Sequence, residues 1–149
     1  MSQLTAKVKI RRAHRSDSAQ IAELSTQLGY PATIREMAGR LSLVIPHRDS
    51  AVFVAFTAPA GVIGWLHVSV TRLLEVPLRA ELNGLVVDDK RRSLGAGAML
   101  LAAAERWAKS HGCKSVSVRS NVIRGRAHAF YERHGYEHYK TQKAFRKIL

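Results

Sequence analysis

Two hydrophobic periods alternate along this chain, and the changes between them mark its predicted strands and helices. Period two, as in Lys7–Arg12 where Val8 and Ile10 share one face, predicts a half-buried strand. Apolar positions that recur every three or four residues predict amphipathic helices. The expected strands are residues 7–12, 51–57, 62–70, 80–87, 115–119 and a last one from Tyr136 toward Phe145, and the expected helices are residues 16–28, 33–45, 95–111 and 124–134.

Local turn signals refine two of these boundaries. Thr33 is followed three residues later by Glu36, the spacing of a capping box, so a helix should begin there. Asn83-Gly84 is the strongest short hairpin signal in the sequence. The pieces on either side of it are too short to pair with each other. We therefore expect a β-bulge at Asn83-Gly84 within one continuous strand.

The most informative stretch runs from Leu85 to Leu101. An apolar, β-branched triplet is followed by charged residues, by Gly95 and Gly97, and then by an Ala/Leu-rich helical pattern. The first N–H groups of a helix have no intrahelical acceptor and lie at the positive end of the helix dipole. Glycines let an anion approach the backbone closely. This strand, loop and helix therefore predict a phosphate-binding site.

Two motifs in this chain resemble those of the GNAT acetyltransferase superfamily. Arg92-x-x-Gly95-x-Gly97 is similar to the Q/R-x-x-G-x-G/A signature that binds the pyrophosphate of acetyl-CoA. The later segment from Arg124 to Tyr136 resembles the family's fourth helix, with Arg124 where asparagine is common. A glycine pattern alone is a weak signal, but both motifs in order are a specific one. The resemblance covers most of the chain and is firmest from about Glu81 to Tyr136.

The resemblance implies a fold and a donor site. The fold would be α/β (α+β), a mixed, mostly antiparallel sheet of six to seven strands flanked by about four helices, in a single N-acetyltransferase domain over residues 1–149. The fourth strand would splay from the fifth so that the pantetheine arm of acetyl-CoA lies between them. The residues expected to bind acetyl-CoA are Leu85, Val86, Val87, Arg92, Ser93, Leu94, Gly95, Ala96, Gly97, Ala98, Asn121, Arg124, Ala127 and Tyr131.

Acetyl transfer to an amine needs a deprotonated amine and a proton for the departing thiolate. By resemblance, Tyr131 is the expected proton donor, since a phenol is mostly protonated at neutral pH; it could instead be only an interfacial aromatic. Glu81 lies eleven residues before Arg92, where several family members place a base that acts through water, and a surface-facing glutamate is an equal alternative. Tyr30 is a candidate acceptor contact, or it packs under its own loop.

Other ionisable residues are interpreted as structural. His67 could face the acceptor, but a lone histidine on a strand is more often a packing or surface residue. Cys113 is expected at the edge of a strand. The seven histidines lack the short paired intervals of a zinc site, so no metal is expected. A single cysteine, no apolar run of membrane length and no signal-peptide core favour a cytoplasmic protein without membrane contact.

The net charge of +13 is unusual and uneven. Residues 84–149 hold 14 Lys/Arg against 5 Asp/Glu, so the excess lies with the predicted cofactor half. It could attract CoA, bind nucleic acid, which is not favoured, or simply keep the protein in solution. The expected function is acetylation of a primary amine of a small molecule. The alternatives are aminoacyl-tRNA or protein amines, or a non-catalytic CoA- or nucleic-acid-binding module. A homodimer through the final strand is left open.

Overall fold

The chain divides into two compact units, Met1–Arg119 and Ser120–Leu149. The computed structural model describes residues 7–120 and 124–149 of them. The expectation of a single domain over the whole chain stays a prediction. The first unit contains β1 (Lys9–Arg12), η1 (Arg15–Asp17), α1 (Ser18–Leu28), α2 (Ile34–Val44), β2 (Ser50–Thr57), β3 (Gly61–Thr71), β4 (Arg79–Val87), η2 (Asp89–Leu94), α3 (Ala96–Ser110) and β5 (Val116–Val118), and the second contains α4 (Gly125–Arg133).

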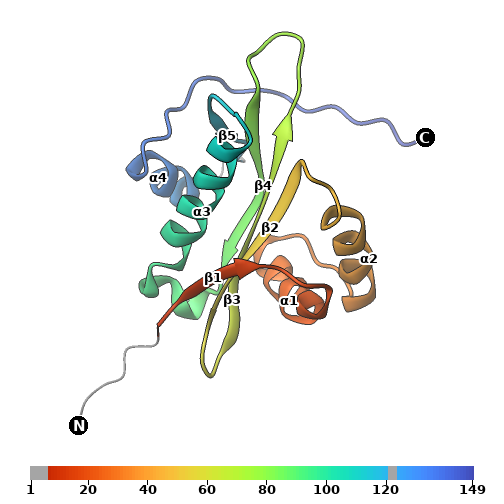
Figure 1. Cartoon of the computed structure of the whole chain (residues 1–149), viewed down its shortest axis with the longest axis vertical. Helices are drawn as coiled ribbons and strands as arrows, with labels where there is room; N and C mark the ends of the chain where they lie inside the picture. The colour runs from red at the N-terminus through yellow and green to blue at the C-terminus, as the bar shows by residue number, and fades with distance from the viewer. Residues whose placement is uncertain (1–6, 121–123) are drawn as a thin grey trace. The chain divides into compact units, whose positions relative to one another are not determined.

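The first unit is built on a five-stranded sheet in the order β1-β2-β3-β4-β5. Each neighbouring pair among β1 to β4 is antiparallel, whereas β5 runs parallel to β4. Helices α1 and α2 lie on one face of the sheet and α3 lies on the other (Figure 1). Both faces are therefore covered, as the mixed α/β expectation requires.

The β-bulge predicted at Asn83-Gly84 is confirmed. His67 pairs with Gly84 and Val68 pairs with Leu82, which leaves Asn83 as the extra residue on β4. The Asn83 side chain uses this freedom to donate a hydrogen bond to Ser69 Oγ at 2.8 Å. An extra residue interrupts the ladder and increases the local twist, so β4 changes direction at this point.

Helix boundaries follow the predicted caps closely. Glu36 N–H donates to Thr33 Oγ1 at 3.0 Å and Thr33 N–H donates to Glu36 Oε1 at 2.9 Å, which completes the capping box of α2. Gly29 ends α1 in the left-handed conformation, with φ of 97°. The start of α1 is more elaborate than expected, because the short helix η1 precedes it. Asp17 there accepts a hydrogen bond from His14 N–H at 2.8 Å.

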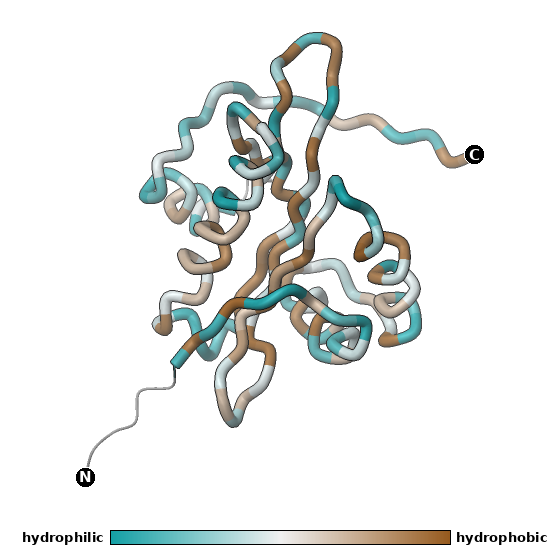
Figure 2. Tube along the Cα trace, in the orientation of Figure 1, coloured by the Kyte–Doolittle hydropathy of each residue, from teal (hydrophilic) through white to brown (hydrophobic). Residues whose placement is uncertain are grey.

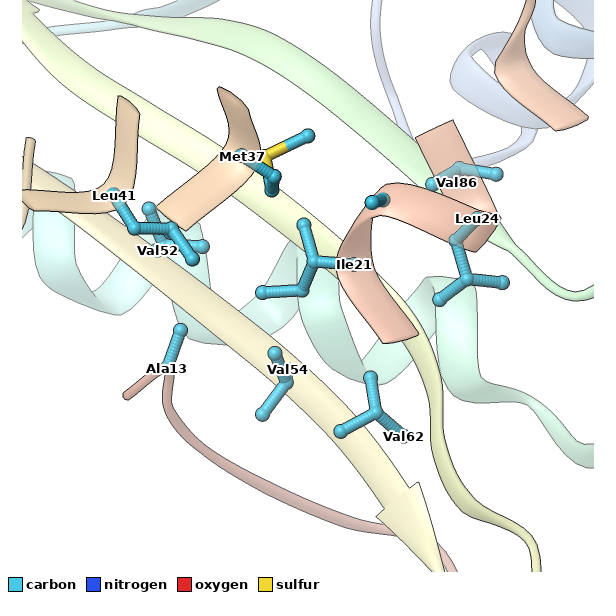
Figure 3. Close-up of a cluster of buried hydrophobic side chains, with 10 residues drawn as sticks. Ala13, Ile21, Leu24, Met37, Leu41, Val52, Val54, Val62 and Val86 are labelled. Atoms are coloured by element: carbon cyan, nitrogen blue, oxygen red, sulfur yellow. The ribbon is translucent and has the colours of Figure 1, made fainter. Parts of the chain in front are cut away.

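The hydrophobic core follows the sequence periods. Between α1, α2 and the sheet, Ile21 and Met37 meet the buried strand residues Val52 and Val54 (Figure 3). On the opposite face, α3 buries the stripe predicted from its 3.6-residue period, namely Leu100, Leu101, Ala104, Trp107 and Ala108. Hydrophobic positions accordingly concentrate on the central strands (Figure 2). None of the helices in the described part of the chain is both long and apolar enough to cross a membrane.

The strand expected from Tyr136 toward Phe145 does not form, so the prediction of six to seven strands was wrong and the described residues form five. Helix α4 is followed by Gly135 at φ of 86°, and residues 137–149 have no regular structure and are exposed. This segment mixes its apolar residues with four lysines and arginines, so it offers no continuous apolar face to bury. The homodimer suggested through this strand stays untested.

Candidate active site

The loop before α3 has the geometry of an anion site. Gly95 adopts the left-handed conformation, with φ of 78°, and α3 begins at the next residue. The N–H of Met99 donates a hydrogen bond to Gly95 O at 3.2 Å, one helical turn earlier. The N–H groups of Ala96, Gly97 and Ala98 therefore lie in the first turn with no acceptor inside the helix. A Cβ built on Gly95 would meet no atom within 4 Å, so the loop is open to an approaching phosphate.

Hydrogen bonds from β3, from α1 and within residues 88–91 hold this loop in place. Asp88 N–H donates to Ile63 O of β3 at 2.8 Å. The Asp88 carboxylate accepts from Lys90 N–H at 3.2 Å and from Arg91 Nη1 at 2.9 Å. The hydrogen bond from Lys90 N–H is the main reason that the pKa of Asp88 lies below its usual value. From α1, Gln27 Oε1 accepts from Asp89 N–H at 3.1 Å. The predicted loop is thus mostly the 3₁₀ helix η2, tied to both sheet and helix.

Strand β4 has a free edge just beyond the bulge. Its pairing with β5 covers Ala80 to Leu82, while Leu85, Val86 and Val87 pair with β3 on the other side. Within the described residues, no strand adjoins Leu85–Val87 on the β5 side. The backbone groups of this edge are the ones that the sequence assigned to the arm of the donor. Free main-chain N–H and C=O groups bind an extended amide-containing chain as a neighbouring strand would.

Glu81 is buried and both of its oxygens are engaged. Glu81 is 6% exposed, and it pairs with Ser117 of β5 in the sheet. Ser117 Oγ donates to Oε2 at 3.0 Å, and Arg119 Nε donates to Oε1 at 3.2 Å. The surface-facing alternative for Glu81 is therefore excluded by its burial. Its role as a base stays a prediction.

Two side chains of β3 that carry polar atoms, Trp65 and His67, lie on the same face of the sheet as Glu81 of β4. Trp65 packs against the α1/α2 core, and His67 follows two residues later on the same side of the strand. Trp65 Nε1 and His67 Nε2 are both buried and, among the residues that the structure describes, have no hydrogen-bond partner. The Trp65 ring covers Gly84, where a Cβ would come within 2.8 Å of two ring carbons. The glycine of the bulge thus makes room for the indole.

Tyr30 lies in the linker between α1 and α2. Its N–H donates to Ser25 O at 3.0 Å and its carbonyl accepts from Ser25 Oγ at 2.6 Å, so both backbone groups are anchored to α1. Its side chain points outward, since Tyr30 is 67% exposed. This exposure is incompatible with packing under its own loop. An acceptor contact by Tyr30 stays a prediction.

The second unit contains the other predicted residues. Arg124 is the N-cap residue of α4, and Ala127 and Tyr131 lie within that helix. Burial raises the pKa of Tyr131 above its usual value, and the charge of Arg124 opposes this shift. The Tyr131 ring contacts Phe130 edge to face at 5.4 Å. Asn121 lies outside the described residues.

A cavity of about 360 Å³ lies elsewhere in the first unit, between β1 and α3. Its lining includes Arg12, Phe53, Arg106 and Trp107, and the Arg12 guanidinium stacks over Phe53 at 5.0 Å. Strand β1 is three strands away from β4 in the sheet. The cavity is therefore separate from the candidate active site.

Comparison with known proteins gives this geometry a family. A model of the Acetyltransferase (GNAT) family matches residues 20–136. The chain belongs to the GNAT family of acetyltransferases. It is 28% identical to the aminoglycoside N(6′)-acetyltransferase type 1 of Stenotrophomonas maltophilia, with 94% of this chain and 93% of that protein covered. It is therefore an N-acetyltransferase that takes its acetyl group from acetyl-CoA.

Solved structures agree with this GNAT assignment at the level of the fold. The aminoglycoside N-acetyltransferase AAC(6′)-Iy in complex with CoA has a TM-score of 0.87 and 18% identity, with 100% of each chain covered. AAC(6′)-Ih of Acinetobacter baumannii has a TM-score of 0.84 and 19% identity, covering 96% of this chain and 99% of that one. The open glycine, the first-turn amides and the free edge of β4 fit an acetyl-CoA molecule in this chain.

The first unit of this GNAT acetyltransferase therefore contains Glu81 and the edge Leu85–Val87 on β4, and the loop Arg92–Ala98 shortly after that strand. Sequence reasoning missed Gln27 and Asp88, which position the loop, and the two partners of Glu81. It considered His67 as an acceptor contact but interpreted it as a packing or surface residue, because an unpartnered nitrogen has no sequence signature. Within residues 7–120 and 124–149, no three His, Cys, Asp or Glu side chains are grouped as a metal site.

Proposed function

We propose that this enzyme acetylates a primary amine of a small molecule, with the donor held at the Arg92–Ala98 loop and along Leu85–Val87. The observation that carries the site assignment is the left-handed Gly95 at the start of α3, which leaves the amides of the first turn open to an anion. Ser93, Leu94 and the exposed Arg92 side chain line the same turn. Arg92 adds a positive charge that favours the diphosphate.

The proposed chemistry uses two further groups of this chain. A backbone N–H on the free edge of β4 stabilises the oxygen of the acyl group as negative charge develops on it. Tyr131 gives its phenolic proton to the departing thiolate, and its raised pKa keeps that proton in place at neutral pH. Acetyl-CoA supplies the activated thioester when bound. Arg124 and Ala127 belong to the proposed donor site because of their places in the family motif, and Asn121, which lies just before that motif, is included with them.

The small-molecule acceptor is supported by the relative from Stenotrophomonas maltophilia, whose name specifies aminoglycosides, and by its near-complete coverage. The linker 28–33 that carries Tyr30 contains no charged residue. The net charge of +13 repels a polycation at long range. Aminoglycosides carry several amines, so this repulsion should appear as a salt-dependent KM and not as their exclusion. Low ionic strength should raise KM for a polyamine relative to a monoamine, since salt screens this repulsion.

The test is release of free thiol from acetyl-CoA in the presence of separate acceptors. The panel contains aminoglycosides, spermidine, small monoamines, a lysine peptide and an aminoacyl-tRNA. We expect turnover with a small amine and little with the peptide or tRNA. Preferential turnover of the peptide or tRNA would overturn the small-molecule assignment. Absence of turnover with every amine, despite binding of acetyl-CoA by calorimetry, would favour a non-catalytic CoA-binding module.

A matched pair of variants tests the donor loop itself. Ala98→Glu places a carboxylate in the first turn of α3, where it is compatible with the helix dipole but competes with a phosphate. Ala102→Glu adds the same charge one turn further along, where the free amides end. We expect Ala98→Glu to raise KM for acetyl-CoA at least about tenfold, because this is the effect of losing one hydrogen bond to a charged group. Ala102→Glu should change this KM far less. Equal effects would move the donor site away from this loop.

A further inference from the structure

The Nε2 atom of His67 is buried and, among the described residues, has no hydrogen-bond partner. It belongs to the residue of β3 that pairs with Gly84, next to the proposed donor edge of β4. We propose that His67 Nε2 takes the proton from the ammonium group of the acceptor, and that Glu81 acts as a positioning residue. This inference rests on the proposed function, because it assigns a role at the same site. A buried polar atom without a partner is rare in native proteins and calls for an explanation. A substrate nitrogen would provide the missing partner.

The sheet register places His67 next to the start of the free edge of β4. His67 pairs directly with Gly84 of the bulge, and the free edge Leu85–Val87 begins at the next residue of β4. Its neighbours along the same face are Trp65, whose ring covers Gly84, and Ser69, which accepts a hydrogen bond from Asn83. The unpartnered indole N–H of Trp65 can donate to a polar atom of the acceptor. One donor and one acceptor thus lie on the side of the sheet that carries the α1–α2 linker.

Glu81 is poorly suited to take this proton. One of its oxygens accepts from Ser117 and the other from Arg119, so a proton would have to displace a charge-assisted hydrogen bond. These contacts also join β4 to β5 just before the two strands separate. Glu81 therefore fixes the position at which the donor arm would enter.

The surroundings of His67 favour the neutral imidazole. Burial lowers the pKa of His67 below its usual value, and no charge offsets this effect. On β2, the residues facing it are Val52 and its neighbours on that face, which are uncharged. Helices α1 and α2 turn apolar side chains to this face of the sheet. On β4 the charged residues are Glu81, which is paired with Arg119, and Arg79, whose Nε is buried without a hydrogen-bond partner among the described residues. On α1 and α2 they are the exposed residues Glu23, Arg35, Glu36 and Arg40.

The proton balance is complete with these groups. The acceptor ammonium gives one proton to His67 Nε2, and the free amine then attacks the acyl carbon. The C–N bond forms as the C–S bond breaks, and the thiolate takes the proton of Tyr131. The second proton lost by the nitrogen restores the phenol. The imidazolium releases its proton to solvent, so each turnover yields one amide, one thiol and one proton.

The experiment compares His67→Gln with Glu81→Gln over a pH range, using a monoamine acceptor and thiol release. For His67→Gln we expect kcat/KM to fall about 100-fold at pH 7, the usual contribution of a general base. The defect should shrink as the pH approaches the pKa of the free amine, because an amine that is already deprotonated needs no base. Glu81→Gln should show a defect that does not depend on pH in this way. The wild type should lose activity below a pKa under 6.5, the unperturbed value of histidine.

The opposite pattern would overturn the proposal: a pH-rescued defect in Glu81→Gln, an unaltered His67→Gln, or a wild-type limb in the carboxylic-acid range near pH 4. Calorimetric binding of acetyl-CoA by His67→Gln checks that the variant is folded. If it is not folded, the wild-type pH limb decides alone. Wild-type enzyme that releases no thiol with any amine would refute the proposed function, which is a different result from retained activity in His67→Gln.

Discussion

Gln27 on α1 contacts two consecutive residues at the start of the proposed donor loop. Its Oε1 accepts from Asp89 N–H at 3.1 Å, and its Nε2 lies 3.4 Å from Asp88 Oδ1. The two contacts link residues that are 61 and 62 positions apart in the chain. One side-chain amide thus fixes the start of η2 relative to the helix layer, and through η2 the position of Gly95.

Gln27→Ala should weaken donor binding more than it slows chemistry. Losing one hydrogen bond of about 1 kcal/mol predicts a KM for acetyl-CoA about fivefold higher, with kcat nearly unchanged. Gln20→Ala is the matched control, because Gln20 on the same helix instead accepts from Val62 N–H at 3.1 Å. That variant should lose similar stability without a change in KM. Equal KM values for the two variants would remove Gln27 from the donor site.

Gly95→Ala tests the left-handed turn separately from any steric clash. A Cβ at Gly95 meets nothing within 4 Å, so the cost is that of the positive φ alone, about 1 kcal/mol. Gly39→Ala is the opposite case, since Gly39 lies in α2 with equally open space. It should stabilise the protein by about 0.5–1 kcal/mol. Urea unfolding measures both, and destabilisation by Gly39→Ala would contradict the helix-propensity argument.

Features set by neighbouring residues were predictable from the sequence. The capping box of Thr33 and Glu36, the bulge at Asn83-Gly84 and the turn at Gly95 each depend on a few adjacent positions. The buried stripe of α3 follows from its own period. The donor loop was predicted from local features of this kind, and its role stays a prediction.

Features set by distant residues were not predictable. Ser117 and Arg119 reach Glu81 only because β5 lies parallel to β4, and Gln27 reaches Asp88 only because α1 packs over the sheet. The last strand was predicted from single apolar positions such as Tyr139 and Phe145. A strand also needs a partner and an apolar face, and the exposed residues 137–149 have neither in the described structure.

The ion pair of Arg11 and Asp17 should make stability depend on pH. Both Asp17 oxygens accept from the Arg11 guanidinium, at 2.8 and 2.9 Å, and these bonds hold the pKa of Asp17 below its usual value. The stabilisation is therefore complete above the unfolded pKa of about 3.9 and is lost as the pH falls through the lower folded value. Asp17→Asn should cost about 2 kcal/mol at pH 7 and less at pH 3.

Urea unfolding at both pH values measures this difference. Asp49→Asn is the control, because its partner Arg72 and Asp49 itself are both well exposed. Such a surface pair contributes about 0–1 kcal/mol, so its loss should be small at either pH. A gap between wild type and Asp17→Asn that stays constant from pH 7 to pH 3 would contradict the assignment.

Tyr131→Phe separates proton donation from packing, since the ring that contacts Phe130 is retained. If the phenol protonates the thiolate, kcat should fall about 100-fold while KM for acetyl-CoA changes little. Because burial raises the pKa of Tyr131, the wild-type kcat should lose activity from deprotonation of this group only at a higher pH than a free phenol would. Tyr139→Phe, at a residue that is 62% exposed in the same unit, should leave both constants unchanged. A Tyr131→Phe variant that loses donor affinity and kcat in equal measure would instead make Tyr131 a binding residue.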